Sequence, residues 1–256
     1  MTETNEQERE RLIQELERTN QELQQFAYIV SHDLKAPLRA IHSLVQWIAE
    51  DYGPLFDDDG REQLDLLQGR VRRMDQLIEG VLHYSRIGRV REEWIPVNLH
   101  KMVTQIIDLL APPAHITIRL ENRLPVVMCE GIRMGQVMQN LLSNAIKFMD
   151  KAHGEIAVRC VEEESLYRFI VADNGPGIPA KDHERIFQIF QTLHSGDSYG
   201  SAGIGLTLVK KIVELHGGEV HVFSPPRQSS AACGTEFEFT LPKRPLEEGA
   251  EEEGEE

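Results

Sequence analysis

One predicted helix carries four polar side chains that could hold a metal ion and phosphate oxygens. At about 100° per residue, these side chains fall within roughly 80° of one another. They are Gln136, Asn140, Asn144 and Lys147. The opposite face is mostly apolar, as in an amphipathic helix that covers a core. Two carboxamides and an ammonium that point the same way can bind such groups, although a solvated helix face would show the same pattern.

Two glycine-rich stretches follow this helix in the sequence. The first, Asp173–Ile178, comes directly after a predicted strand, and its glycines would let the backbone approach a flat ligand closely. The Asp173 carboxylate could accept a hydrogen bond from an exocyclic amine. The second, Gly203–Leu206, opens a predicted helix whose free N–H groups favour an anion. The first stretch alone could be an ordinary turn and the second alone is a weak signal, but with the polar helix they indicate a nucleotide site.

His32 faces away from the apolar seam of its own helix. It lies about 200° from both Val30 and Leu34, with Asp33 beside it. A histidine on a helix surface is most often simply solvated. This one lies in a segment that also contains Pro37, where the apolar spacing becomes irregular.

The elements that would position His32 form a helical hairpin. Residues 8–50 show one long pattern of apolar side chains in steps of three and four. Residues 51–60 predict a loop, and residues 64–81 predict a returning helix. Pairing two hairpins into a four-helix bundle would bury both seams, so we expect a homodimer. A monomeric hairpin packed on the rest of the chain is the alternative.

The second half of the chain reads as mixed α/β. Residues 87–96 resemble a charged linker. Beyond it, helical patterns lie near 98–110, 131–149, 182–190 and 203–216, and strand patterns lie near 115–120, 155–162, 166–173, 218–223 and 234–241. This order favours an α+β two-layer sandwich, with one mixed sheet and helices on one face.

Composition narrows the possible functions. A net charge of −15 over 256 residues argues against a nucleic-acid partner. No apolar run is long enough for a membrane segment, and the polar N-terminus is unlike a signal peptide. The three cysteines lack CxxC spacing and the histidines lack an HExxH pattern, so we expect reduced, structural cysteines, no zinc site and a cytoplasmic location. Residues 247–256 hold seven glutamates and predict a disordered acidic tail.

Five of these segments resemble the boxes of one protein family. Ser31–Leu38 resembles the phosphoacceptor box of sensor histidine kinases. The family's four nucleotide boxes are similar, in order and spacing, to Asn140–Phe148, Asp173–Ile178, Arg185–Phe190 and Gly203–Leu206. The resemblance covers roughly residues 20–242. It implies an all-α helical hairpin that dimerises into a four-helix bundle, followed by an α+β two-layer sandwich of the gyrase-like, Bergerat type.

The resemblance also implies a domain organisation. It consists of a coiled-coil linker (1–22), a dimerisation and histidine-phosphotransfer domain (23–86), a linker (87–96), an ATP-binding catalytic domain (97–243) and a disordered acidic tail (244–256). The implied partners are a second copy of the chain, a response-regulator receiver domain and an upstream sensor domain or protein.

Roles carry over from the family position by position. His32 resembles the phosphoacceptor, and Asp33 resembles the residue that orients and activates it. Asn140 resembles the ligand of Mg²⁺, and Asp173 resembles the carboxylate that recognises the adenine of ATP. The remaining nucleotide contacts implied are Asn144, Lys147, Gly175, Gly177, Ile178, Gly203, Ile204, Gly205 and Leu206.

Three positions depart from the family pattern. Gln136 replaces the glutamate that activates water in related ATP hydrolases, which favours transfer to histidine over hydrolysis. Ala36 stands where many bifunctional members have the Thr or Asn used to dephosphorylate the partner, so the resemblance leaves open whether this chain has phosphatase activity. Ser201 replaces a common glycine in the second glycine-rich stretch. The expected function is ATP-dependent phosphorylation of His32 and transfer to an aspartate; a nucleotide-binding scaffold and a gyrase-type ATP hydrolase are the alternatives.

Overall fold

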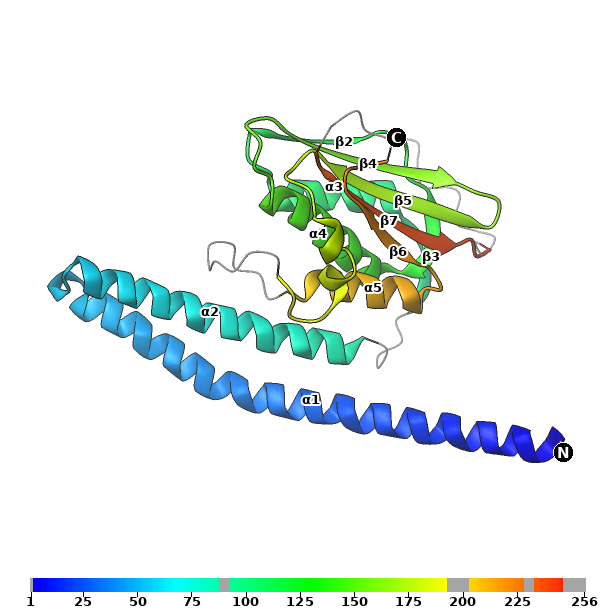
Figure 1. Cartoon of the computed structure of the whole chain (residues 1–256), viewed down its shortest axis with the longest axis horizontal. Coiled ribbons are helices and arrows are strands. Elements are labelled where there is room, and N and C mark those ends of the chain that lie inside the picture. Colours follow the sequence, from blue (N-terminus) through cyan, green and yellow to red (C-terminus); the bar gives the residue numbers. More distant parts are fainter. Residues whose placement is uncertain (1, 88–92, 193–202, 228–232, 246–256) are drawn as a thin grey trace. The chain divides into compact units, whose positions relative to one another are not determined.

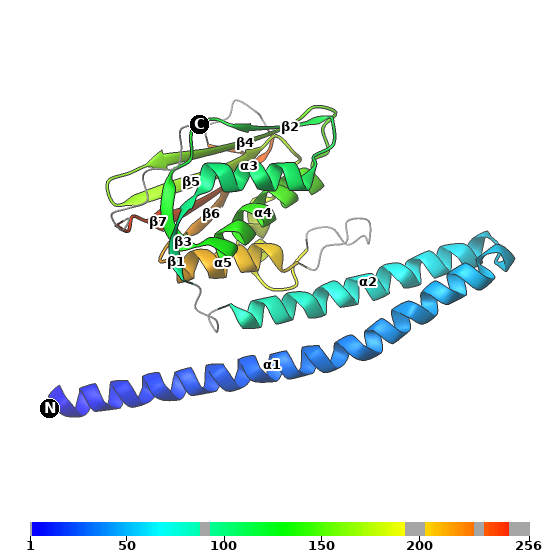
Figure 2. The same cartoon turned by 180° about the vertical axis from the view of Figure 1, so that it is seen from behind.

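The computed structural model describes residues 2–87, 93–192, 203–227 and 233–245; of the side chains before residue 25 it describes only some. The chain divides into two compact units, one built around two long helices and the other around a β-sheet. Figures 1 and 2 show both from opposite sides. In the part of the chain described, no helix combines the length and the apolar composition needed to cross a membrane.

The first unit is the predicted helical hairpin. Helix α1 runs from Thr2 to Tyr52 and helix α2 from Asp58 to Arg86, with a single 3₁₀ turn, Gly53–Leu55, between them. The connection is shorter than predicted because α2 begins early: the Asp57 side chain accepts the Gly60 N–H at 2.9 Å and so caps the helix. Pro37 lies inside α1 without ending it, and Figure 1 shows α1 as one continuous, curved helix.

The core of the hairpin is small. Leu38 and Val45 of α1 and Val71 of α2 are buried together, with Leu64 and Ile78 packed partly against them. The positions three residues further along the same seams stay exposed; they are Ile41, Ile48, Leu67 and Met74. Each apolar seam is therefore split, with one row facing the other helix of the hairpin and one row facing outward.

The second unit contains a five-stranded mixed sheet of order β2-β4-β5-β7-β6. Strands β2 and β4 are parallel and the other neighbours are antiparallel. The strands are β2 (Ile116–Leu120), β4 (Gly154–Glu162), β5 (Leu166–Asp173), β6 (Val220–Phe223) and β7 (Thr235–Pro242). Helices α3 (Leu99–Leu110), α4 (Gly131–Lys147) and α5 (Gly205–Leu215) cover one face of the sheet, which Figure 2 shows clearly. The predicted two-layer α+β fold and mixed sheet are confirmed.

Two details of the sequence interpretation were wrong. A separate two-stranded sheet, β1 (Trp94–Asn98) with β3 (Val126–Glu130), was not predicted, and β1 begins inside the segment assigned to the linker. The helix predicted near 182–190 is only two 3₁₀ turns, Ala180–Asp182 and Arg185–Phe187. Phe190 has φ of 65°, a left-handed conformation that ends any helical continuation there.

Candidate nucleotide and phosphoacceptor sites

Asn140 stands where helices α4 and α5 meet. Its Nδ2 donates to the Gln136 carbonyl at 2.8 Å, which fixes the orientation of the amide. Its Oδ1 lies 2.7 Å from the point where a Cβ atom would be built on Gly205, the first residue of α5. A larger residue at position 205 would require the Asn140 amide to move. The structure therefore brings the predicted metal ligand against the predicted phosphate-binding turn.

Asp173 ends strand β5 and is held by two backbone groups. Its Oδ1 accepts the Gly175 N–H at 2.8 Å and the Thr235 N–H at 3.3 Å. Burial raises the pKa of this carboxyl to about 6; the two N–H donors act in the opposite direction, and the charge of Asp150 raises the pKa further. A partly buried carboxylate that two N–H donors hold in place is suited to accept a further hydrogen bond from a ligand amine.

Gly177 allows the loop after β5 to close against a second segment. It has φ of 80°, and a Cβ atom there would lie 2.7 Å from Ser224 Oγ. The Ser224 hydroxyl accepts the Ile178 N–H at 2.9 Å and donates to the Gly234 carbonyl at 2.6 Å. The His183 ring is 3.0 Å from the Ile178 carbonyl oxygen. The backbone of the loop after β5 therefore forms this wall of the site, and the Ser224 hydroxyl holds it in place.

The C-terminal end of α4 lies beside the same loop. A Cβ atom on Gly175 would lie 3.7 Å from the Phe148 carbonyl oxygen, which places the loop against the end of the helix. Asn144 and Lys147 occupy the last turn of α4, partly buried. Burial lowers the pKa of Lys147. Its ammonium lies 5.6 Å from the centre of the Phe148 ring.

The start of α5 presents the N–H groups of Gly205, Leu206 and Thr207. The first intrahelical bond runs from Leu208 N–H to the carbonyl of Ile204, which is itself buried, so these three N–H groups precede the hydrogen-bonded ladder. Gly203 has φ of 69°, and its carbonyl accepts the Phe190 N–H at 3.0 Å. This is the geometry of an anion-binding helix N-terminus. Ser201 lies outside the described residues.

The donor set fits a magnesium ion that arrives with a nucleotide. Mg²⁺ is usually held by one or two protein oxygens together with phosphates and water. The fixed Asn140 Oδ1, next to the α5 N-terminus, supplies one such oxygen. Among the described residues, no group of three or more His, Cys, Asp or Glu side chains could hold a metal ion without phosphate.

The opposite end of α5 is fixed by His216. Its Nε2 accepts the Glu130 N–H at 3.2 Å, and its Nδ1 donates to the Ile212 carbonyl at 2.8 Å, so the buried ring is neutral with its proton on Nδ1. Trp94 packs against the ring with centroids 4.7 Å apart. The pKa of His216 is lowered, first by burial. This contact joins α5 to the β3–α4 junction.

His32 lies on α1 with its side chain exposed. Its Nδ1 is 3.1 Å from Asp33 Oδ1, and its ring stacks loosely against Tyr28 at a centroid distance of 6.4 Å. Lys35, one turn along the helix, forms an ion pair with Glu79 of α2. With Nδ1 turned toward the carboxylate, Nε2 is the nitrogen available to an incoming group.

Two residues of the nucleotide site were missed by the sequence interpretation, Ser224 and Thr235. Neither belongs to a recognisable box. Thr235 reaches Asp173 because β7 pairs with β5 in a register that places these two residues opposite each other. The residues predicted at the site are otherwise distributed over α4, the loop after β5 and the start of α5, and the contacts above bring those three segments together.

The cysteines differ in environment. Cys129 in β3 and Cys160 in β4 are buried, and burial raises the pKa of each thiol to about 12. Cys233 is exposed, so the prediction of three structural cysteines holds for two of them.

Comparison with known proteins matches both units. Residues 22–89 match the model of the His Kinase A (phospho-acceptor) domain, and residues 129–245 match that of the histidine kinase-, DNA gyrase B- and HSP90-like ATPase. The chain is 45% identical over 232 residues to Cyanobacterial phytochrome B of Nostoc sp. (strain PCC 7120), which covers 89% of this chain. It spans only 30% of the length of that relative.

Solved histidine kinases have the same fold. Full-length ShkA, in complex with AMPPNP, matches with a TM-score of 0.63 and 24% identity over 87% of this chain and 46% of its own. Histidine kinase ThkA, in complex with the response regulator protein TrrA, matches with a TM-score of 0.59 and 22% identity over 90% of this chain and 66% of its own. The two family models, the relative and the fold agree: this chain belongs to the sensor histidine kinases.

Proposed function

We propose that this chain binds ATP with Mg²⁺, phosphorylates its own His32 and passes the phosphoryl group to an aspartate of a response-regulator receiver domain. The observation that carries the proposal is the exposed His32, with Nδ1 3.1 Å from Asp33, in the same chain as a glycine-lined site with a raised-pKa carboxyl. An ATP site alone would fit many enzymes. The histidine supplies the acceptor.

Each residue of the nucleotide site has a separate role in this proposal. Asp173 accepts from the adenine amine, Asn140 would hold Mg²⁺, and the N-terminus of α5 binds phosphate oxygens. The ion would neutralise charge on the phosphates. Asn144 and Lys147 lie on the same helix and contact phosphate or metal-bound groups.

Transfer to histidine requires a neutral nitrogen and a fixed ring. Asp33 accepts a hydrogen bond from Nδ1–H, which leaves the Nε2 lone pair free to attack the γ-phosphorus. The N–P bond forms as the bond from phosphorus to the bridging oxygen breaks, and ADP leaves. Transfer requires the γ-phosphate held by the sheet-containing unit to reach Nε2 of His32, and we propose residues 87–96, which lie partly outside the described residues, as the hinge.

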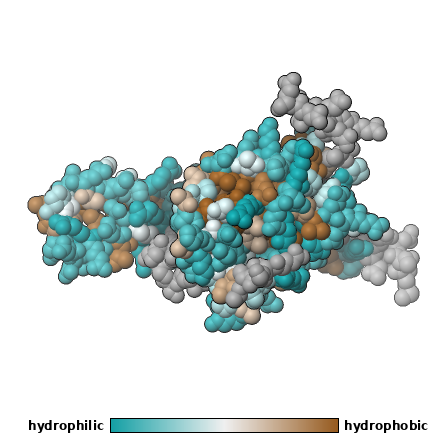
Figure 3. Space-filling model, turned by 90° about the horizontal axis from the view of Figure 1, so that it is seen from above, coloured by the Kyte–Doolittle hydropathy of each residue, from teal (hydrophilic) through white to brown (hydrophobic). Residues whose placement is uncertain are grey.

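We infer a homodimer because half of each apolar seam of the hairpin stays exposed. Burying an apolar side chain contributes about 1.5–3 kcal/mol, and ordering each residue costs about 1–2 kcal/mol in backbone entropy. The small cluster around Val71 is insufficient for two helices of this length. The exposed row that contains Ile41 and Met74 is the surface we assign to a second copy. On the face seen in Figure 3, by contrast, the largest group of hydrophobic residues at the surface lies over the sheet-containing unit.

The remaining parts of the proposal concern partners and location. ThkA, whose fold this chain shares, was solved with a response regulator protein, and we propose the same class of partner here. An upstream sensor domain or protein would act on α1. Because ATP and receiver domains are cytoplasmic, we propose that the chain works in the cytoplasm.

Incubation with γ-labelled ATP and Mg²⁺ tests the function. We expect acid-labile, base-stable label on the wild-type chain and none on His32→Gln, with label retained on His42→Gln, which changes another histidine of α1. Nucleotide binding without label would support a scaffold instead. Rapid phosphate release that His32→Gln leaves unchanged would support an ATP hydrolase, although Gln136 is a poor base for activating water.

A further inference from the structure

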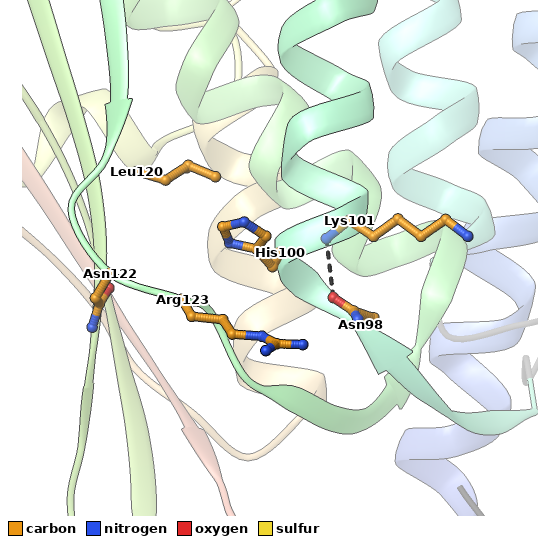
Figure 4. Close-up of a pocket in the computed structure, with 6 residues that line it drawn as sticks. All are labelled: Asn98, His100, Lys101, Leu120, Asn122 and Arg123. Atoms are coloured by element: carbon orange, nitrogen blue, oxygen red, sulfur yellow. Dashed lines mark hydrogen bonds between the residues drawn. The ribbon is translucent and has the colours of Figure 1, made fainter. Parts of the chain in front are cut away.

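The sheet-containing unit has a cavity that the proposed chemistry does not use. Its volume is about 500 Å³. Figure 4 shows that its lining comes from the end of β1, the first turn of α3 and the segment after β2. The lining residues are Asn98, His100, Lys101, Leu120, Asn122 and Arg123.

The hydrogen-bond acceptors of this lining are already occupied. Asn98 Oδ1 accepts the Lys101 N–H at 3.0 Å, and His100 Nδ1 accepts the Leu124 N–H at 3.5 Å. Both ends of the Asn122 amide are bonded to the backbone of Cys160. The neighbouring carboxylate, Glu121, pairs with Arg159 at 3.5 Å.

What the cavity offers to a ligand is donors and positive charge. Because His100 Nδ1 accepts a hydrogen bond, the proton of the neutral ring is on Nε2. Arg123 adds a guanidinium group, whereas Figure 4 shows the Lys101 side chain extending away from the cavity, so its ammonium adds positive charge beside the lining. A lining rich in donors suits a carboxylate-rich occupant, in a chain whose net charge is otherwise −15.

The sequence contains a matching anion. Residues 247–256 include seven glutamates that the proposed function leaves unused. The structure fixes where this segment begins, since the Arg244 guanidinium lies 3.7 Å from the centre of the Trp94 ring. Trp94 and Asn98 are the two ends of β1, which are about 13 Å apart. Eleven residues beyond Pro245 reach up to about 36 Å, so the segment is long enough to enter the cavity.

We propose that the glutamate-rich segment 247–256 docks in this cavity as an intramolecular electrostatic contact. The tether supplies an effective concentration of roughly millimolar, so even a weak attraction is populated. Because the lining is open to solvent, added salt should release the segment. The contact would tie the C-terminal end of the sheet to the start of α3.

The test compares the full chain with a variant of equal length in which all seven glutamates are changed to glutamine. At low salt we expect backbone amide NMR shifts to differ between the two at His100, Lys101 and Arg123, and the differences to vanish at about 0.5 M NaCl. Arg123→Gln should remove most of the difference. Arg119→Gln, which changes an exposed arginine of β2 outside the cavity, should leave it unchanged.

A carbodiimide cross-link provides a second readout. We expect Lys101 joined to a tail glutamate, with the yield reduced several-fold by Arg123→Gln or high salt. Identical cavity amides in the two chains, or tail cross-links spread evenly over the exposed lysines, would show that the segment stays in solvent and would overturn the proposal. Neither measurement uses nucleotide, so failure here is separate from failure of the proposed kinase activity.

Discussion

The side-chain oxygen of Asn140 lies 2.7 Å from the position that a Cβ atom would occupy at Gly205. This close approach of α4 and α5 places the free N–H groups at the start of α5 beside the amide oxygen of Asn140. A methyl group at residue 205 would displace the Asn140 amide from the orientation that its hydrogen bond to the Gln136 carbonyl fixes.

Gly205→Ala should therefore weaken nucleotide binding at least tenfold. A loss of about 1.4 kcal/mol in binding free energy is enough to raise the dissociation constant by that factor. Isothermal titration calorimetry with a non-hydrolysable ATP analogue measures the effect. The matched control is Gly135→Ala in α4, whose Cβ would meet only Met102 Sδ at 3.9 Å. Gly135→Ala should bind nucleotide normally and gain up to about 1 kcal/mol in stability. Equal affinities for the two variants would contradict the role given to the Asn140–Gly205 contact.

The second prediction concerns the pH dependence of binding. Burial raises the pKa of Asp173 to about 6, and only the ionised carboxylate accepts from an adenine amine. Affinity for nucleotide should fall as the pH drops through about 6. Asp150→Asn removes a charge that raises the pKa of Asp173, so it should move this transition to lower pH. A binding curve that is flat from pH 7.5 to 5 would exclude Asp173 as the adenine acceptor.

Asp173 also affects stability, with the opposite sign. Because its folded-state pKa lies above the ordinary value of 3.8, the ionised carboxylate is less favourable in the folded than in the unfolded chain. Below pH 3.8 the carboxyl is protonated in both states, and its contribution to the free energy of unfolding is fully present. This contribution is lost as the pH rises through about 6 and the carboxyl ionises in the folded chain. At neutral pH, Asp173→Asn should consequently raise the unfolding temperature of the nucleotide-free chain while abolishing tight binding, which thermal unfolding with and without nucleotide can show.

The third prediction concerns His216, whose pKa is lowered by burial. Its neutral ring accepts the Glu130 N–H, and a protonated ring could not. The stabilisation should be fully present above the ordinary histidine pKa of about 6.5 and decline as the pH falls below it. His216→Phe keeps an aromatic ring beside Trp94 but leaves the Glu130 N–H unpaired, at a cost of about 1–3 kcal/mol.

Chemical denaturation at pH 7.5 and 5.5 checks this. His216→Phe should be less stable at pH 7.5 and show a smaller loss between the two pH values than the wild type. His221→Gln, which changes an exposed histidine of β6, should behave as the wild type at both. An unchanged pH slope in His216→Phe would mean that other groups set the acid sensitivity.

The fourth prediction separates dimerisation from hairpin stability. Ile41→Lys places a charge on the exposed row and should convert a dimer to monomers, as measured by light scattering after size exclusion. Val71→Ala instead opens a cavity in the hairpin core, with an expected cost of about 2 kcal/mol. Glu62→Lys introduces a lysine at an exposed polar position of α2 and serves as the control. If the Ile41→Lys variant remains a dimer, the dimer interface lies on a different surface.

The long elements could be predicted because their apolar spacing is regular. The seams of α1 and α2 and the alternation in β4, β5 and β7 are strong local signals. Strands β1 and β3 were missed because each has five residues, and Pro96 lies inside one of them. Their pairing is a long-range property: Trp94 meets Glu130, which is 36 positions later.

The nucleotide site was predictable to the extent that its residues form contiguous boxes. Asn140, Asp173 and the glycines each lie in such a box, and the contacts among them follow from the packing of α4 on α5 and of the loop after β5 on α4. Ser224 and Thr235 belong to no box and reach the site only through the strand register. The fixing of α5 by His216 depends on Trp94 and Glu130, which are more than 80 positions away.

The contrast among the three cysteines makes this chain suitable for site-selective labelling without mutagenesis. With pKa values near 12, the buried thiols of Cys129 and Cys160 have almost no thiolate at neutral pH and will resist maleimide or iodoacetamide. Cys233 is exposed and lies two residues before Thr235, whose N–H contacts Asp173. A fluorophore attached there would report the arrival of adenine directly, in the native sequence and in real time.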